Sequence, residues 1–204
     1  LTLRVWRFTD GRAGHDKQSY GLVQGLRESL PETAGAGSSI ECRDIPVAEF
    51  LRDPSQLWQD SGAAPDLLIG AGRRTHLPMA RVRWHLGSRT VCLMRSTLPR
   101  FCYDLALVPE HDWLWSERKV LRTLGALGPS IPGAPSAEFG LILLGGENDH
   151  FYWSDEEVCA SVSAIVTQNP RVHWQISDSP RSSKNLISAV DRALHGADTV
   201  SYTH

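Results

Sequence analysis

The hydrophobic positions of the chain follow two patterns, one typical of buried strands and one typical of helices. Apolar or alternating runs predict strands at 3–8, 39–45, 66–70, 89–94, 104–108, 119–124, 139–144 and 171–177. Apolar residues at helical spacing predict helices at 15–29, 47–60, 76–86 and 182–194, and one that starts at the Ser154–Glu157 capping box. Residues 31–37 are expected to form a loop, and the final ADTVSYTH the start of another strand. This alternation predicts an α/β fold of doubly wound parallel sheets with helices on both faces.

A segment rich in glycine and proline, 125–137, divides this pattern in two. We therefore expect a Rossmann-like domain at 1–124, a linker at 125–137 and a second Rossmann-like domain at 138–204. Only about two strand–helix units follow the linker, so the second domain is predicted to be incomplete in this sequence. The charge changes sign at the same place, because 1–137 holds 17 Lys and Arg against 14 Asp and Glu, and 138–204 holds 4 against 9.

The composition excludes several classes of protein. The net charge of −2 argues against a nucleic-acid-binding protein, and no apolar run approaches the ~20 residues of a membrane-spanning helix. Arg4 and Arg7 interrupt the apolar start of the chain, so we expect no signal peptide. The four cysteines lack C-x-x-C spacing and the eight histidines lack metal-ligand spacing. This predicts no metal site and a reducing, cytoplasmic setting.

The loop after the first predicted strand combines glycines with groups suited to proton transfer. Gly11 and Gly14 would let the backbone approach a ligand at a helix start, although a tight turn with positive φ explains them equally well. Asp10 and His15 lie where acid or base chemistry could occur.

The loop after the third predicted strand resembles a dinucleotide-binding fingerprint. Its GAGRRT run starts at Gly70 and lacks the last glycine of G-x-G-x-x-G. No acidic residue stands about 20 residues further on, so we reject an NAD site. Gly72 followed by Arg73 and Arg74 at a helix start instead suits phosphate or another anion, while solvated surface arginines explain the pair equally well.

A third loop places Glu110 and His111 at the end of a strand, where they could form a proton-transfer pair. Neighbouring side chains of an extended segment point to opposite sides, so the spacing alone gives no geometry. Trp113 and Trp115 follow, and could stack on a sugar or, as we favour, pack against the protein.

A fourth loop carries Gly145 and Gly146, followed by Asn148, between a strand and a helix start. Backbone N–H groups in such a loop can cradle a diphosphate. The acidic residues close by oppose this interpretation, because they make the local field negative.

Four segments together resemble one protein family. They are TDGRAGHDKQSYGL (9–22), IGAGRRTHLP (69–78), DLALVPEHD (104–112) and LLGGENDHFYW (143–153). The family is the mitochondrial-fission elongated-mitochondria family, whose bacterial members are often described as nucleoside-diphosphate-sugar epimerase-like. It looks like GT-B glycosyltransferases, which implies two Rossmann-like domains around a cleft. The resemblance also implies a nucleotide-sugar donor held mainly by the second domain, an acceptor and base held mainly by the first, and no metal or resident cofactor.

On this resemblance, the expected activity is metal-independent transfer from a nucleotide sugar. The catalytic base would be His15, Glu110 or His111, with Asp10 as its orienting partner. The glycine loop at 145–146 would stabilise the leaving diphosphate, with Arg73 and Arg74 assisting from the first domain.

The seven arginines of residues 71–100, with no acid among them, could attract an anionic, lipid-linked acceptor or a membrane surface. The latter would place a cytoplasmic protein peripherally at the inner membrane.

Two other functions stay open. The plant members resemble adaptors that recruit a membrane-remodelling GTPase, so a non-catalytic interaction protein is the first alternative. A nucleoside-diphosphate-sugar epimerase is the weaker one, because the dinucleotide fingerprint and a Tyr-x-x-x-Lys pair are missing. The sequence leaves the oligomeric state open.

Overall fold

The computed structural model describes residues 1–55, 64–112, 118–129, 136–148, 152–179, 181–195 and 200–203. The chain splits into two compact units, Leu1–Ile131 and Pro132–His204. This division falls within the predicted linker at 125–137, of which 130–135 lie outside the described residues. Trp113 and Trp115 also lie outside them.

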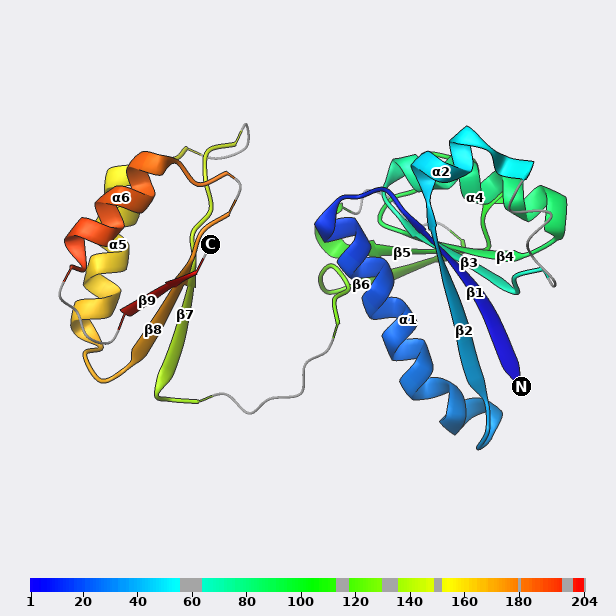
Figure 1. The fold of residues 1–204 in the computed structure, drawn as a ribbon, viewed down its shortest axis with the longest axis horizontal. Helices are drawn as coiled ribbons and strands as arrows, with labels where there is room; N and C mark the ends of the chain where they lie inside the picture. The colour runs from blue at the N-terminus through cyan, green and yellow to red at the C-terminus, as the bar shows by residue number, and fades with distance from the viewer. Residues whose placement is uncertain are drawn as a thin grey trace. The chain divides into compact units, whose positions relative to one another are not determined.

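Six parallel strands form the sheet of the first unit (Figure 1). The strands are β1 (Thr2–Thr9), β2 (Ser39–Pro46), β3 (Leu67–Ala71), β4 (Arg89–Leu93), β5 (Leu105–Pro109) and β6 (Val120–Thr123). The helices are α1 (Ala13–Ala34), α2 (Val47–Arg52) and α4 (Arg73–Leu86), with short 3₁₀ turns at Arg100–Cys102 and Glu110–Asp112. The strand order is β2-β1-β3-β4-β5-β6. All six strands predicted here are confirmed to within one residue at each end.

Helices cover both faces of this sheet, because its strands are too apolar to leave a face in water. On one face α1 places Val23 in a buried cluster with Ile69 of β3. On the other face α2 and α4 contribute Phe50 and Met79 to a cluster around Phe8. The Phe8 and Phe50 rings meet edge to face, with centroids 5.7 Å apart. Each such side chain stabilises the fold by about 1.5–3 kcal/mol when fully buried.

The helix α1 extends beyond the point at which its proline predicted an end. It runs through Pro31 to Ala34, so the prediction of a loop from residue 31 is wrong. Pro31 lies in the last turn of the helix, and its missing N–H leaves the carbonyl oxygen of Arg27 without the partner that a regular helix would give it. The hydroxyl of Thr33 donates to the carbonyl oxygen of Ser29 at 3.0 Å and supports this turn.

The other two helices differ from their predicted bounds as well. Because α4 begins at Arg73 rather than residue 76, Pro78 is its sixth residue and not part of its first turn. Pro78 therefore lacks the N–H that would bond to the carbonyl of Arg74. Helix α2 ends at Arg52 instead of residue 60, and residues 56–63 lie outside the described part of the chain.

An ion-pair network ties α4 to β4 and to the start of β5. Arg83 of α4 pairs with Asp104, which also accepts the backbone N–H of Thr90 at 2.9 Å. Burial raises the pKa of the Asp104 carboxyl, but the bonds from Arg83 and Thr90 outweigh burial and leave the pKa below its usual range. The network therefore fixes the position of α4 on the sheet.

The second unit has a sheet of three parallel strands in the order β7-β8-β9 (Figure 1). Its elements are β7 (Phe139–Leu143), α5 (Asp155–Gln168), β8 (His173–Ser177), α6 (Lys184–Ala193) and β9 (Val200–Thr203). The capping box prediction is confirmed at its first bond, because the Ser154 hydroxyl accepts the N–H of Glu157. The predicted strand in the last residues is β9.

Both helices described in the second unit pack on one face of its sheet (Figure 1). Their core includes Val162, Ile176 and Leu186. The alternate side chains of β7 point to the opposite face, where Phe139 and Leu143 are 67% and 71% exposed. Among the described elements, no helix covers this face.

Two structural facts bear on the exclusions drawn from composition. None of the described helices is long and apolar enough to cross a membrane. The four cysteines are free thiols, and burial raises the pKa of Cys92 to about 12, so this thiol stays protonated in the core.

Candidate functional site

The strand order places the candidate site of the first unit. β1 lies between β2 and β3, so the chain leaves β1 and β3 toward opposite faces of the sheet. In open parallel sheets, ligands bind outside the carboxyl ends of the strands at such a reversal. The loops after β1 and β3 carry Asp10, His15 and Gly72 to this point.

Asp10 and His15 form a hydrogen-bonded pair at the end of β1. The carboxylate Oδ2 of Asp10 lies 2.9 Å from Nδ1 of His15, and its Oδ1 accepts the backbone N–H of Arg12 at 3.1 Å. The Asp10 side chain is 1% exposed and that of His15 is 17% exposed. Because a carboxylate only accepts hydrogen bonds, Nδ1 of His15 carries the proton and Nε2 is left as the ring's acceptor. This arrangement fixes the orientation of the His15 ring and leaves Nε2 able to accept a hydrogen bond.

Gly72 holds the His15 ring from the other side. The backbone of Gly72 has φ +81°, and a Cβ built on it would fall 2.4 Å from Cε1 and Nδ1 of His15. Its N–H donates to the carbonyl of Leu93 at 3.4 Å, so the residue is tied to the end of β4. The position therefore requires glycine for two reasons, its backbone conformation and the contact with the ring.

A polar pocket of about 510 Å³ opens at His15, which we call the arginine pocket. It is lined by Arg12, His15, Gly72, Arg73, Met94, Arg95, His111 and Asp112. No ion pair joins its three arginines to any residue that the structure describes. The N-terminus of α4 at Arg73 also has no side-chain cap. Unpaired guanidinium groups beside an uncapped helix start favour an anionic ligand.

Four residues of the arginine pocket, Arg12, Met94, Arg95 and Asp112, are not among the predicted site residues, although Arg95 belongs to the arginine-rich stretch 71–100. Met94 and Arg95 follow β4, a strand end at which the sequence shows no glycine turn. Met94 adopts φ +70°, a conformation that costs a residue with a side chain about 1 kcal/mol or more. Its N–H bonds to the carbonyl of Leu107 at 2.8 Å, which holds this conformation in place.

The predicted Glu110–His111 pair is divided between two environments. The segment Glu110–Asp112 forms a 3₁₀ turn rather than an extended strand end. His111 lines the arginine pocket but is 66% exposed, and its Nε2 lies 4.0 Å from Asp112. Glu110 is exposed and does not line this pocket. The structure thus brings His111 to the side of His15 and leaves Glu110 outside.

His76 of α4 is a second buried histidine that the sequence did not single out. It is 1% exposed, and its Nδ1 accepts the backbone N–H of Thr97 at 3.3 Å. Burial, with a smaller effect from the neighbouring His15, lowers the pKa of His76 to about 4. His76 is therefore neutral at pH 7 and ties the loop after β4 to α4.

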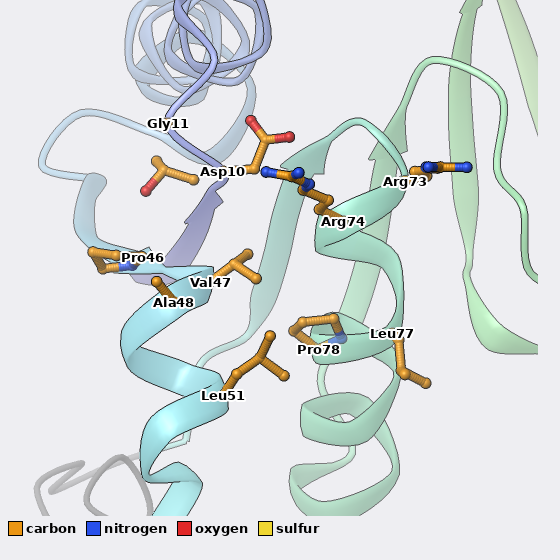
Figure 2. Close-up of a pocket in the computed structure, with 11 residues that line it drawn as sticks. Asp10, Gly11, Pro46, Val47, Ala48, Leu51, Arg73, Arg74, Leu77 and Pro78 are labelled. Carbon is orange, nitrogen blue, oxygen red and sulfur yellow. The ribbon is translucent and has the colours of Figure 1, made fainter.

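A second pocket, of about 650 Å³, lies between α2 and α4 (Figure 2). We call it the α2–α4 groove, and it is lined by Thr9, Asp10, Gly11, Pro46, Val47, Ala48, Leu51, Arg73, Arg74, Leu77 and Pro78. Asp10 and Arg74 lie at one end, and Val47, Leu51 and Pro78 face one another beyond them (Figure 2). Of the two predicted glycines after β1, Gly11 has the positive φ of a turn, +77°, and lines this groove. Gly14 lies within α1.

In the second unit, the loop after β7 is locked to the loop after β8. A Cβ on Gly146 would fall 1.7 Å from the carbonyl oxygen of Arg181, so this close contact requires glycine. The hydroxyl of Ser182 donates to the carbonyl oxygen of Gly145 at 2.7 Å. The two glycines thus have a packing role, and the predicted contact of Gly145, Gly146 and Asn148 with phosphate stays a prediction.

A pocket of about 380 Å³ adjoins this loop. It is lined by Glu147, Tyr152, Trp153, Ser154, Asp155, Glu156, Arg181 and Ser183. The carboxylate of Asp155 orders it, because it accepts Nε1–H of Trp153 at 2.8 Å and the hydroxyl of Ser183. Gly145, Gly146 and Asn148 do not line this pocket.

Metal binding has no candidate in the described part of the chain. No three His, Cys, Asp or Glu side chains gather there in a way that could hold an ion.

A family model described as mitochondrial fission ELM1 matches residues 13–203. The chain belongs to this family. The match confirms the resemblance carried by the four sequence segments. No curated protein matches the chain in sequence.

Two solved structures are similar in fold to the ELM1 family chain. The first, assigned as a UDP-N-acetylglucosamine 2-epimerase from Listeria monocytogenes, has a TM-score of 0.58 and 9% identity over 100% of this chain and 69% of that one. The second, MnaA of S. aureus in a structure with UDP, has a TM-score of 0.54 and 8% identity over 99% and 68%. At this identity the likeness shows the fold alone, and it confirms the expected GT-B-type α/β architecture.

We expect Gly72→Ala to disturb the site more than Gly87→Ala. Both glycines have positive φ, +81° and +74°, but a Cβ on Gly87 meets nothing within 4 Å. Gly87→Ala should lower the free energy of unfolding by about 1 kcal/mol. Gly72→Ala should lower it further and shift the NMR signals of the His15 ring. Unchanged His15 signals in Gly72→Ala would show that the ring does not rest on this glycine.

Acid should weaken the first unit through His76. The unfolded chain binds a proton below its ordinary pKa of 6.5, whereas folded His76 binds one only near 4. Stability is therefore lost as the pH falls between these values, by up to about 3 kcal/mol. Denaturant unfolding near pH 7 and near pH 4.5 should show a smaller loss for His76→Asn, which keeps an acceptor for Thr97. An equal loss in both proteins would contradict this role of His76.

Proposed function

We propose that the protein is a glycosyltransferase that takes its sugar from a nucleotide-sugar donor. The observation that carries this proposal is the Asp10–His15 pair, at the reversal point of the strand order, on the wall of a pocket with three unpaired arginines. The family match and the GT-B-type fold agree with it, and the S. aureus relative in fold holds UDP.

In this reaction His15 acts as the general base. Its Nε2 takes the proton of an acceptor hydroxyl, and the hydroxyl oxygen then forms a bond to the anomeric carbon of the sugar. The bond between that carbon and the diphosphate oxygen breaks, and the nucleoside diphosphate leaves with the electron pair. Asp10 fixes the ring and stabilises the charge that His15 gains, as a carboxylate partner does in other base-activated sites.

The arginine pocket supplies positive charge for the leaving diphosphate. Arg12, Arg73 and Arg95 have no carboxylate partner in the described chain, so binding a diphosphate breaks no ion pair there. Such cations stabilise the developing charge of a phosphate leaving group. On this proposal the reaction needs neither a metal nor a resident cofactor.

An epimerase is the second candidate, because the Listeria monocytogenes structure of similar fold is assigned as one. An epimerase converts the nucleotide sugar with no acceptor, whereas a transferase releases the nucleoside diphosphate only when an acceptor is present. Acceptor dependence therefore separates the two.

We expect one nucleotide to stabilise the protein against heat. UDP, GDP and CMP, with their sugars, should be screened by thermal shift, with inorganic phosphate at equal concentration as the control. A ligand at about one hundred times its Kd adds about 2.7 kcal/mol of stability, which raises Tm by several degrees. If no nucleotide exceeds phosphate, the arginine pocket is a general anion site and the transferase proposal fails.

Asp10→Asn and His15→Ala should each lower turnover with little effect on nucleotide binding. Loss of a general base costs about 10²- to 10⁴-fold in rate. The measurement is the release of nucleoside diphosphate from the nucleotide sugar that stabilises the protein in the thermal-shift screen, with a total lipid extract as the source of acceptor. His111→Ala is the matched control, since His111 lines the same pocket but is 66% exposed and lies 4.0 Å from the Asp112 carboxylate, with no buried carboxylate at hydrogen-bond distance. Full turnover in His15→Ala, or its loss in His111→Ala alone, would move the base away from His15.

A further inference from the structure

The α2–α4 groove is lined largely by apolar side chains, and a nucleotide sugar has no apolar chain that could pack against them. Six of its eleven lining residues are Pro46, Val47, Ala48, Leu51, Leu77 and Pro78. Leu51 and Leu77 remain 55% and 48% exposed at its rim. Single exposed leucines are ordinary, but two that line one concave pocket of about 650 Å³ are typical of a site for an apolar ligand group.

At the end nearest the Asp10–His15 pair, the groove carries Arg73 and Arg74 against one carboxylate, that of Asp10, which leaves positive charge in excess. Arg73 and Arg74 line it, and neither forms an ion pair with any described residue. Figure 2 shows Arg74 beside Asp10, while Arg73 points away from the apolar side chains. A ligand that fits this groove therefore combines an apolar body with an anionic group at one end.

The groove and the arginine pocket share a wall. Arg73 lines both, and Asp10 of the groove holds His15 of the arginine pocket by the 2.9 Å bond. One molecule with its apolar part between α2 and α4 would have its polar end beside Asp10 and Arg73, where the groove adjoins the arginine pocket. The nucleotide, which has no apolar chain, belongs with the polar pocket.

We infer that the α2–α4 groove binds the acceptor, and that this acceptor is an anionic amphiphile with an aliphatic chain. The role of this ligand as an acceptor rests on the proposed transferase function, whereas its binding in the groove does not. Leu51, Leu77 and Pro78 hold the chain, Arg74 pairs with the phosphate or carboxylate, and a hydroxyl close to that charge reaches His15.

Dodecyl phosphate, kept below its critical micelle concentration so that single molecules bind, is the probe. Its affinity for the full chain should be measured by titration calorimetry. Dodecanol, dodecyltrimethylammonium and inorganic phosphate are measured in the same way for comparison. We expect dodecyl phosphate to bind at least about tenfold more tightly than each of them. Binding of inorganic phosphate as tightly as the alkyl phosphate would overturn the inference, because the chain would then contribute nothing.

Variants at the rim test the place of binding without disturbing the core. Leu51→Gln with Leu77→Gln should weaken dodecyl phosphate at least about tenfold, and Arg74→Gln should weaken it while sparing the neutral analogue. Leu121→Gln is the matched control, because Leu121 of β6 is 56% exposed and lies outside the groove. A photoactivatable dodecyl phosphate should label peptides of α2 and α4. Equal binding by the rim variant, or labelling confined to the exposed face of β7, would place the ligand elsewhere and overturn the inference.

The outcomes separate this inference from the transferase proposal. If a nucleotide stabilises the protein but the alkyl phosphate does not bind, the acceptor class is wrong and the transferase stands. If the alkyl phosphate binds in the groove but no nucleotide stabilises the protein, the groove remains an amphiphile site and the transferase proposal falls.

Discussion

The parallel pairing of β1 with β3 is the constraint on which the rest of the first unit depends. Four residue pairs, from Val5–Leu67 to Phe8–Gly70, set these strands side by side and end them at the same edge of the sheet. Because β2 occupies the other side of β1, the chain returns to β3 only after passing over the sheet. The chain then leaves β1 and β3 toward opposite faces, and this brings Asp10, His15 and Gly72 together at one end of the sheet.

The chemical character of the site comes from a difference in pairing between its buried carboxylate, which has hydrogen-bond partners, and its arginines, which form no ion pair with the described residues. Asp10 is satisfied twice, by the N–H of Arg12 and by His15, so its carboxylate has a fixed place. The surrounding arginines have no such partner in the described chain, and three of them against the single carboxylate of Asp112 leave a surplus of positive charge beside the His15 ring. The nearby groove adds apolar surface to the same wall. These features lie close together: a buried carboxylate, arginines without ion pairs and the apolar α2–α4 groove. They favour a ligand that has one charged part and one apolar part.

The sequence predicted the strands well and the helix ends poorly, for a physical reason. Buried parallel strands must be apolar along their whole length, so their bounds are visible in the pattern itself. The end of a helix depends on local hydrogen bonds that the hydrophobic pattern does not reveal. α1 runs through Pro31 although residues 31–34 are exposed, with Thr33 bonded to Ser29, and α4 starts at Arg73. A proline in the sequence therefore did not mark the end of either helix.

The site divides in the same way. Asp10 and Gly72 were found because each directly follows a strand, and His15 because it lies at the start of the helix after β1; the topology then brings these strand ends together. Glu110 and His111 were indistinguishable in sequence, since only the 3₁₀ turn separates them. Met94 and Arg95 follow a strand without a glycine signal. His76 looks like any histidine on a helix, and its importance comes from burial beneath a loop twenty-one residues away.

The contact between Gly146 and Arg181 has an evolutionary consequence. Two loops that are far apart in sequence share a space too small for one methyl group, so neither can lengthen or gain a side chain alone. We therefore expect a substitution at Gly146 to require a change in the loop after β8 as well, whereas the pocket residues around Trp153 lie outside this contact and can change singly.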